Sequence, residues 1–200
     1  MTSMILADGT MGQMMEPVSL DMGEITHYGK PWAVTGTGGS REPNSIGRPH
    51  NIINSLLLQP EELERFNFER YARYKVVEEN EVMYEEYMME DADICLVAFG
   101  VTARVSKNAI KIAREQGIKV GLIRPITLWP FPKAVLRNAA EKVRAFVSVE
   151  LSMGQMIEDV ELATRCIRPV LLCNRTGGVI MTPEEVVAKI KEADEIGGSK

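Results

Sequence analysis

Cysteine and histidine are scarce in this sequence. Its 200 residues include three cysteines and two histidines. Cys95, Cys166 and Cys173 are far apart or lie inside apolar runs, a spacing that excludes the clustered thiols of metal and iron–sulfur motifs. We therefore assign no metal ligand, and we expect buried thiols in a reducing, cytoplasmic setting. His27 and His50 lie apart from any nucleophilic motif and are expected to be solvated, so we assign no catalytic residue.

Long apolar runs and an excess of basic residues are also absent. No apolar run approaches the ~18 residues of a membrane span and no signal peptide opens the chain, so we expect no membrane segment. The formal net charge is -5, and residues 61–93 alone hold 12 acids and 4 bases, so the rest of the chain is slightly basic. Binding to nucleic acid needs a basic face, so we expect none. The acidic stretch is interpreted as the solvated side of a helix, with a basic partner subunit as the alternative.

The sequence does contain a near-repeat of nine residues. Thr10–Val18 (TMGQMMEPV) reappears as Ser152–Val160 (SMGQMIEDV), and each copy follows an apolar run that ends in an acid. Both copies fit a capping box, in which a hydroxyl accepts from a first-turn amide and the side chain three positions later reaches back. The hydroxyl and amide pairs are Thr10 with Gln13 and Ser152 with Gln155. Pro17 in the first copy predicts a short or kinked helix.

The glycine of each copy leaves the backbone bare beside the helix N-terminus. An anion site or a subunit contact at Gly154 and Gln155 is therefore the alternative to a plain cap. In the second copy, apolar residues at helical spacing predict a buried helix face. They are Met153, Met156, Ile157 and Val160.

The chain alternates between short apolar runs and helical patterns after residue 91. We expect strands at 94–99, 118–123, 145–149 and 169–173, and helices at 103–116, 133–142, 155–164 and 183–194, the last capped by Thr182. This alternation predicts a three-layer α/β/α sandwich with a mostly parallel sheet. Upstream we expect a strand at 4–8, a short helix at 11–16, and a long helix that begins at Pro60 and breaks near Asn80. We expect the buried side of this long helix to consist of Leu63, Phe66, Tyr74, Val77, Tyr84, Tyr87 and Met88.

Three domain segments follow from this pattern: residues 1–16, a linker at 17–60 that is rich in Gly, Pro and Asn, and the α/β domain at 61–200. An unpaired strand at 4–8 could pair with a second copy of the chain in a homodimer. Within the linker, Gly36–Arg41 resembles a phosphate loop in composition only, because no helix follows it.

Ligands of such sheets bind beyond the carboxyl ends of the strands. The best anion-binding candidate there is the segment after the last strand, where an arginine side chain precedes two glycines whose backbone amides are accessible. A simple turn is an equally good interpretation of this segment. Its residues are Arg175, Thr176, Gly177 and Gly178. After the first strand of the α/β domain, Gly100 is expected to serve a tight turn and Thr102 to cap the next helix.

Several segments together, in this order, resemble one protein family. They are Asp8–Val18, Asn51–Leu63, Gly121–Pro132, Glu150–Met156 and Arg175–Gly178. They look like the alpha subunit of 2-oxoacid:ferredoxin oxidoreductases, above all the 2-oxoisovalerate (3-methyl-2-oxobutanoate) type. The resemblance implies that residues 1–16 are the end of a pyrimidine-binding thiamine domain and that 61–200 form a transketolase C-terminal-like domain. Gly39–Ile46 looks like an insertion relative to the family.

The resemblance also implies a chemistry and a set of partners. The reaction would be oxidative decarboxylation of a 2-oxoacid to an acyl-CoA with reduction of ferredoxin. Thiamine diphosphate, Mg, iron–sulfur clusters and coenzyme A would be bound by the assembled complex with beta (thiamine-diphosphate), gamma and ferredoxin-like subunits, and none by this chain alone. Ala7–Gly9 lacks the first glycine and the following Asn of a thiamine diphosphate–Mg motif. The portion present would serve subunit assembly. The alternatives are a stand-alone α/β small-molecule-binding protein or the C-terminal domain of another thiamine enzyme.

Overall fold

The computed structural model describes residues 3–21, 23–24, 26 and 56–198. The chain divides into two compact units, Met1–Met14 together with Arg73–Lys200, and Met15–Ala72. The predictions for His27, His50, Gly36–Arg41 and Gly39–Ile46 lie outside the described residues, as does most of the predicted linker. The three predicted domain segments therefore stay a prediction.

The larger unit is built on one five-stranded sheet with the strand order β1-β3-β2-β4-β5. The strands are β1 (Tyr84–Tyr87), β2 (Ile94–Val97), β3 (Val120–Pro125), β4 (Ala145–Glu150) and β5 (Val170–Asn174). Strands β2 to β5 are parallel, and β1 lies antiparallel to β3 at one edge with Tyr84 opposite Pro125. The mostly parallel sheet confirms the prediction, while β1 was not predicted.

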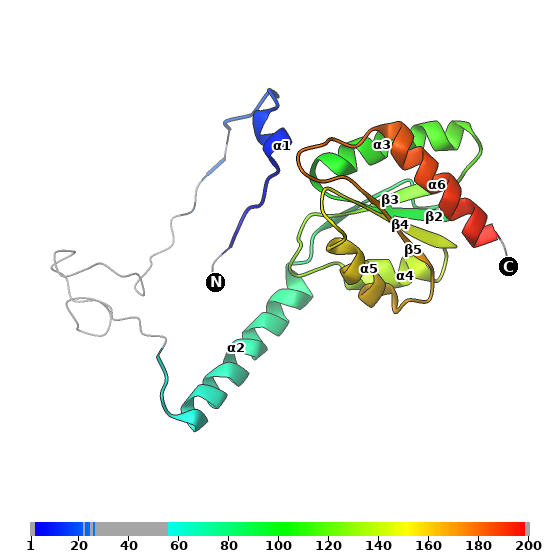
Figure 1. Cartoon of the computed structure of the whole chain (residues 1–200). Helices are drawn as coiled ribbons and strands as arrows, with labels where there is room; N and C mark the ends of the chain where they lie inside the picture. The colour runs from blue at the N-terminus through cyan, green and yellow to red at the C-terminus, as the bar shows by residue number, and fades with distance from the viewer. Residues whose placement is uncertain (1–2, 22, 25, 27–55, 199–200) are drawn as a thin grey trace. The chain divides into compact units, whose positions relative to one another are not determined.

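Helices cover both faces of the sheet (Figure 1). The helices α3 (Gly100–Glu115) and α6 (Pro183–Gly198) pack on one face, and α4 (Lys133–Ala140) and α5 (Met156–Thr164) pack on the other. Alternate side chains of β2 enter the two cores: Ile94 and Leu96 on the α3/α6 side, Cys95 and Val97 on the α4/α5 side. These layers confirm the predicted three-layer α/β/α sandwich.

The starts of α6 and α5 test the predictions that were made from local sequence patterns. A capping box starts α6, because the Thr182 amide donates to Glu185 Oε2 at 2.9 Å and the Glu185 amide donates to Thr182 Oγ1 at 3.4 Å. Met156 and Val160 of α5 are buried as predicted, and Ile157 is partly so. Met153 is exposed, contrary to the predicted stripe, because it precedes the helix.

The long helix α2 (Pro60–Asn80) begins at the predicted residue and ends at the predicted break, but it does not continue to Met88 as expected. The prediction of a buried side was wrong, since α2 has no buried residue. Tyr84 and Tyr87 belong to the edge strand β1 instead, and Tyr84 and Met88 are exposed. Within the described residues no helix combines the length and apolar character of a membrane span.

The N-terminal segment carries the short helix α1 (Gly9–Gln13), which ends before Pro17 as expected. The predicted strand at residues 4–8 is absent, and Met4, Ile5 and Leu6 are exposed. A strand exists only through its neighbours, and none of the described strands lies beside this segment.

The buried-thiol prediction holds for Cys95 and Cys173 and fails for Cys166, which is exposed. The reason is the end of α5, where Arg165 and Cys166 both have left-handed backbone, with φ values of 56° and 53°. The chain therefore leaves the helix at the surface before it enters β5.

Candidate functional site

Strands β2 and β4 define the point at which a ligand of this fold is expected. The chain runs from β2 outward to β3 and then returns across β2 to β4, so the strand order reverses between β2 and β4. Parallel sheets bind ligands beyond the carboxyl ends of the strands at such a point. Two helices begin there, α3 after β2 and α5 after β4.

Glu150, the last residue of β4, occupies the N-terminus of α5. The residue is 4% exposed. Two hydroxyls donate to its carboxylate, Ser148 Oγ at 2.8 Å and Ser152 Oγ at 2.6 Å. Three backbone amides also donate, each at 2.9 Å, from Gln155, Met156 and Ile157. The carboxylate thus satisfies amides of the helix start that would otherwise lack a partner.

These donors decide the charge state of Glu150. Burial alone would raise the pKa of the carboxyl. The hydrogen bonds from Ser152 Oγ, the Met156 amide, Ser148 Oγ and the Ile157 amide together outweigh burial and hold the pKa below its usual value. Glu150 is therefore a buried anion in a site built for it.

The predicted capping box of Ser152 and Gln155 is wrong. Ser152 Oγ donates to Glu150 and accepts only long contacts from the amides of Gly154 and Gln155, at 3.4 and 3.5 Å. The residue at the cap position of α5 makes no side-chain capping bond. A buried carboxylate provides two acceptor oxygens where a hydroxyl provides one, so Glu150 takes the amides instead.

The first copy of the repeat is also capped by its acid. Asp8 Oδ1 accepts from the Met11 amide at 2.7 Å, and Asp8 Oδ2 accepts from the Val101 amide of α3 at 3.2 Å. Thr10 lies inside α1 rather than at its cap, so the capping box predicted for Thr10 and Gln13 is wrong as well. Each helix start at the strand-order reversal is therefore occupied by a carboxylate of the chain itself.

The start of α3 fits the Asp8 carboxylate closely. Gly100 has a φ of 60°, and a Cβ placed on it would lie 2.9 Å from Asp8 Oδ2. Gly100 thus serves a tight turn as predicted and also permits this approach. Thr102 is not the cap, because its hydroxyl donates to the carbonyl of Phe99 at 2.7 Å.

The Arg175 segment forms a turn beside this region. Arg175 makes an ion pair with Glu185 of α6, and the Val179 amide donates to the Thr176 carbonyl at 3.3 Å. Gly177 and Gly178 have φ values of 66° and 86°. A small cavity of about 260 Å³ adjoins the turn. Anion binding at this segment stays a prediction, with the charge of Arg175 already engaged by a carboxylate.

Gly154 and Gln155 lie at the start of α5. Gly154 has a φ of 102°, and a Cβ there would lie 3.2 Å from Leu172 Cδ2. Its backbone therefore requires glycine for reasons within the chain. Gln155 is exposed. A partner contact at these two residues stays a prediction.

Sequence reasoning placed the site at the strand ends but missed Asp8 and Glu150 as its central residues. The signal was present, since each apolar run before the repeat ends in an acid. Across the described residues, no three His, Cys, Asp or Glu side chains could hold a metal ion together. We therefore derive no step through a metal or cluster on this part of the chain.

The fold of the chain is similar to that of two solved structures. A structure titled as a 2-oxoglutarate:ferredoxin oxidoreductase from Magnetococcus marinus matches with a TM-score of 0.60 and 20% identity, over 81% of this chain and 30% of that one. A split-gene transketolase matches with a TM-score of 0.51 and 20% identity, over 57% of this chain and 42% of that one. The fold is therefore the transketolase C-terminal-like α/β fold.

Sequence comparisons narrow the class. Residues 92–186 match the family described as pyruvate:ferredoxin oxidoreductase core domain II. Ketoisovalerate oxidoreductase subunit VorB of Methanothermobacter marburgensis is 48% identical over 94% of this chain and 51% of its own length. 2-Oxoglutarate synthase subunit KorA of the same organism is 38% identical over 50% of this chain and 27% of its own length. The chain is related to the 2-oxoacid:ferredoxin oxidoreductase family, and these relatives are oxidoreductase subunits.

The chain spans about half the length of the curated VorB relatives that it matches. These similarities are to subunits of the predicted family. The predicted label, alpha subunit, is not the one these relatives carry, since they are named subunit VorB.

Proposed function

We propose that this chain is part of the alpha subunit of a thiamine-diphosphate-dependent 2-oxoacid:ferredoxin oxidoreductase of the cytoplasm. The enzyme would convert a branched-chain 2-oxoacid to its acyl-CoA and reduce ferredoxin. The 48% identity to a ketoisovalerate oxidoreductase subunit supports this substrate class. Thiamine diphosphate, Mg, iron–sulfur clusters and coenzyme A would be held in the assembly with beta, gamma and ferredoxin-like subunits.

We assign this portion to assembly rather than to catalysis, and one observation carries that assignment. At the strand-order reversal, where a ligand of the fold would bind, amides at the starts of α3 and α5 already donate to Asp8 and Glu150. The amides of Met156 and Ile157 both bond to the Glu150 carboxylate. A substrate phosphate or carboxylate would have to displace these bonded carboxylates to reach the same amides.

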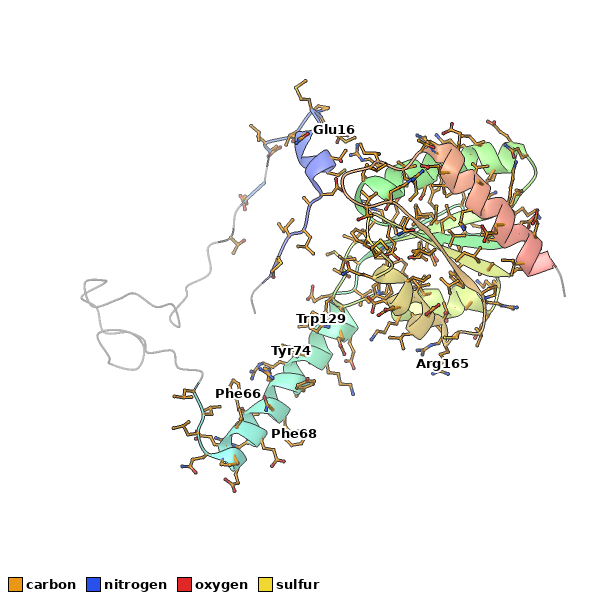
Figure 2. All side chains as sticks on the ribbon, viewed as in Figure 1. Glu16, Phe66, Phe68, Tyr74, Trp129 and Arg165 are labelled. Atoms are coloured by element: carbon orange, nitrogen blue, oxygen red, sulfur yellow. The ribbon has the colours of Figure 1, made fainter. Side chains whose placement is uncertain are left out.

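The helix α2 offers the surface that assembly requires. Its exposed large apolar side chains are Leu63, Phe66, Phe68, Tyr71 and Val76. At 100° per residue these five positions lie on all sides of the helix. Charged residues lie between them, so α2 is not apolar all round, but exposed aromatic side chains such as Phe66, Phe68 and Tyr71 are of the kind enriched in protein interfaces. Figure 2 shows Phe66 and Phe68 on the helix away from Tyr74, which packs edge to face on Trp129 with ring centroids 5.5 Å apart. We assign the exposed apolar surface of α2 to contact with partner subunits.

Co-expression with the proposed partner subunits tests this function. The purified complex is assayed for reduction of ferredoxin that depends on both coenzyme A and a 2-oxoacid. We expect 2-oxoisovalerate to give a higher kcat/KM than pyruvate or 2-oxoglutarate. A complex that forms but prefers pyruvate or 2-oxoglutarate overturns the substrate class. A chain that remains separate from every such subunit overturns the proposed function.

A further inference from the structure

Asp8 contacts two helices with one carboxylate. Its Oδ1 accepts from the Met11 amide of α1 at 2.7 Å, and its Oδ2 accepts from the Val101 amide of α3 at 3.2 Å. Residues 8 and 101 lie 93 positions apart in the chain. The carboxylate therefore joins the N-terminal segment to the first helix of the α/β sandwich.

The start of α3 has no cap of its own. Phe99 holds the cap position and provides no side-chain hydrogen bond. The hydroxyl of Thr102 donates to the Phe99 carbonyl and so does not serve a first-turn amide. A helix start needs acceptors for its first amides. For Val101 that acceptor comes from Asp8, and the bare Cα of Gly100 leaves room for it.

Apolar burial cannot account for the attachment of the N-terminal segment. Met4, Ile5 and Leu6 are exposed, and α1 has no buried residue. A second polar contact lies nearby, where Arg104 Nη1 approaches Met14 Sδ at 3.7 Å. The attachment of residues 3–14 to α3 therefore includes polar contacts, and the Asp8 carboxylate makes one of them.

We propose that Asp8 is a positioning residue that clamps residues 3–14 onto the start of α3. The clamp fixes the place at which the N-terminal segment meets the α/β sandwich. The role of the clamp in an assembled oxidoreductase rests on the proposed function, whereas the contact itself lies within this chain.

Amide hydrogen exchange on the full chain tests the clamp with Asp8→Asn. The new side chain keeps one acceptor oxygen for the Met11 amide but turns an NH₂ group toward the Val101 amide. We expect exchange at Val101 to accelerate about fivefold, the effect of a lost helix cap. Exchange in β4 and α5 should not change. Asp21→Asn is the matched control, because it removes the same charge from an exposed acid whose carboxylate accepts from the local Gly23 amide. Unchanged exchange at Val101 in Asp8→Asn overturns the proposal.

A double-mutant comparison provides the second test. Gly100→Ala places a methyl group against Asp8 Oδ2 and strains the turn. If the clamp exists, Gly100→Ala should raise exchange at Val101 strongly in the native chain and only weakly in the Asp8→Ala background. Equal increases in both backgrounds overturn the clamp. These measurements need no partner subunit, so their failure leaves the oxidoreductase assignment standing, and failure of the co-expression assay leaves the clamp standing.

Discussion

At the scale of single residues, Glu150 is the most consequential side chain of the described site. Glu150→Gln would replace one carboxylate oxygen by an NH₂ group, which would face either the Gln155 and Met156 amides that donate to Oε2 or the Ile157 amide that donates to Oε1. We expect a loss of about 3 kcal/mol in the free energy of unfolding at pH 7, since hydrogen bonds to a buried charge are costly to break. Urea unfolding of the two proteins measures this difference.

The pH dependence of that difference provides an independent check. The pKa of Glu150 is held below its usual value in the folded chain. Its stabilising contribution is therefore complete above the unfolded pKa of about 4.3 and is lost as the pH falls through the lower folded pKa. The gap between wild type and Glu150→Gln should be constant from pH 7 to about pH 5 and shrink below about pH 4. A gap that persists unchanged at low pH contradicts this account.

Ser152 acts through Glu150 rather than as an independent cap. Its hydroxyl donates to Glu150 Oε2 at 2.6 Å. Ser152→Ala should cost on the order of 1 kcal/mol and should also raise the pKa of Glu150. In the Glu150→Gln background the same change should cost much less. Thermal unfolding of the wild type, the two single variants and the double variant gives the coupling energy between Ser152 and Glu150. Strictly additive costs would restore Ser152 as a cap in its own right.

At the scale of helices and strands, the predictable elements are those with one buried face. The strands β2 to β5 and the helices α3 to α6 follow from local apolar patterns. The edge strand β1 does not, because its sequence is Tyr-Glu-Glu-Tyr. Glu85 of β1 bonds to Lys107 at 2.5 Å and to Arg124 at 3.1 Å, and chiefly the Lys107 ammonium lowers the pKa of its carboxyl. These partners lie 22 and 39 positions away in the sequence, so a pattern of neighbouring residues cannot predict them.

The candidate site shows the same division. Its location follows from strand order, and its glycines and hydroxyls are visible in the repeat. The acid caps were missed because Thr10 and Ser152 satisfy the capping-box pattern. That pattern does not show whether the hydroxyl or a nearby carboxylate accepts from the first-turn amides. At α6 no buried acid competes, and Thr182 and Glu185 do form the box. The start of α5 differs from that of α6 because Glu150 is buried at the end of β4. This burial depends on how the whole sheet packs and cannot be seen in the local sequence.

The helix α2 gives a prediction about assembly. Phe68 is 71% exposed on α2 and Leu162 is 72% exposed on α5, so the two are matched in exposure. Phe68→Glu should abolish or strongly reduce co-purification with the partner subunits, because a charge would enter an apolar contact. Leu162→Glu is the control and should leave co-purification intact. Circular dichroism checks that both variants remain folded. Equal co-purification of the two variants would remove α2 from the interface.

At the scale of the whole molecule, the chain corresponds to part of the longer subunits that it resembles. The chain matches about half the length of its VorB relatives. Its described residues form a complete three-layer sandwich, with an exposed helix and a carboxylate at each helix start of the strand-order reversal. These features suit a domain that positions other parts of an enzyme.

The isolated chain should therefore bind no thiamine diphosphate and have no oxidoreductase activity. A diphosphate–Mg group needs several oxygen ligands around the cation and donors for its phosphates. Among the described residues no three His, Cys, Asp or Glu side chains come together to hold a metal ion, and amides at the helix starts where phosphates would bind donate to Asp8 and Glu150 instead. Calorimetric titration with thiamine diphosphate and Mg should show no binding heat, while the co-expressed complex, as positive control, should bind. Micromolar affinity in the isolated chain would contradict the assembly role and place the cofactor site on these residues.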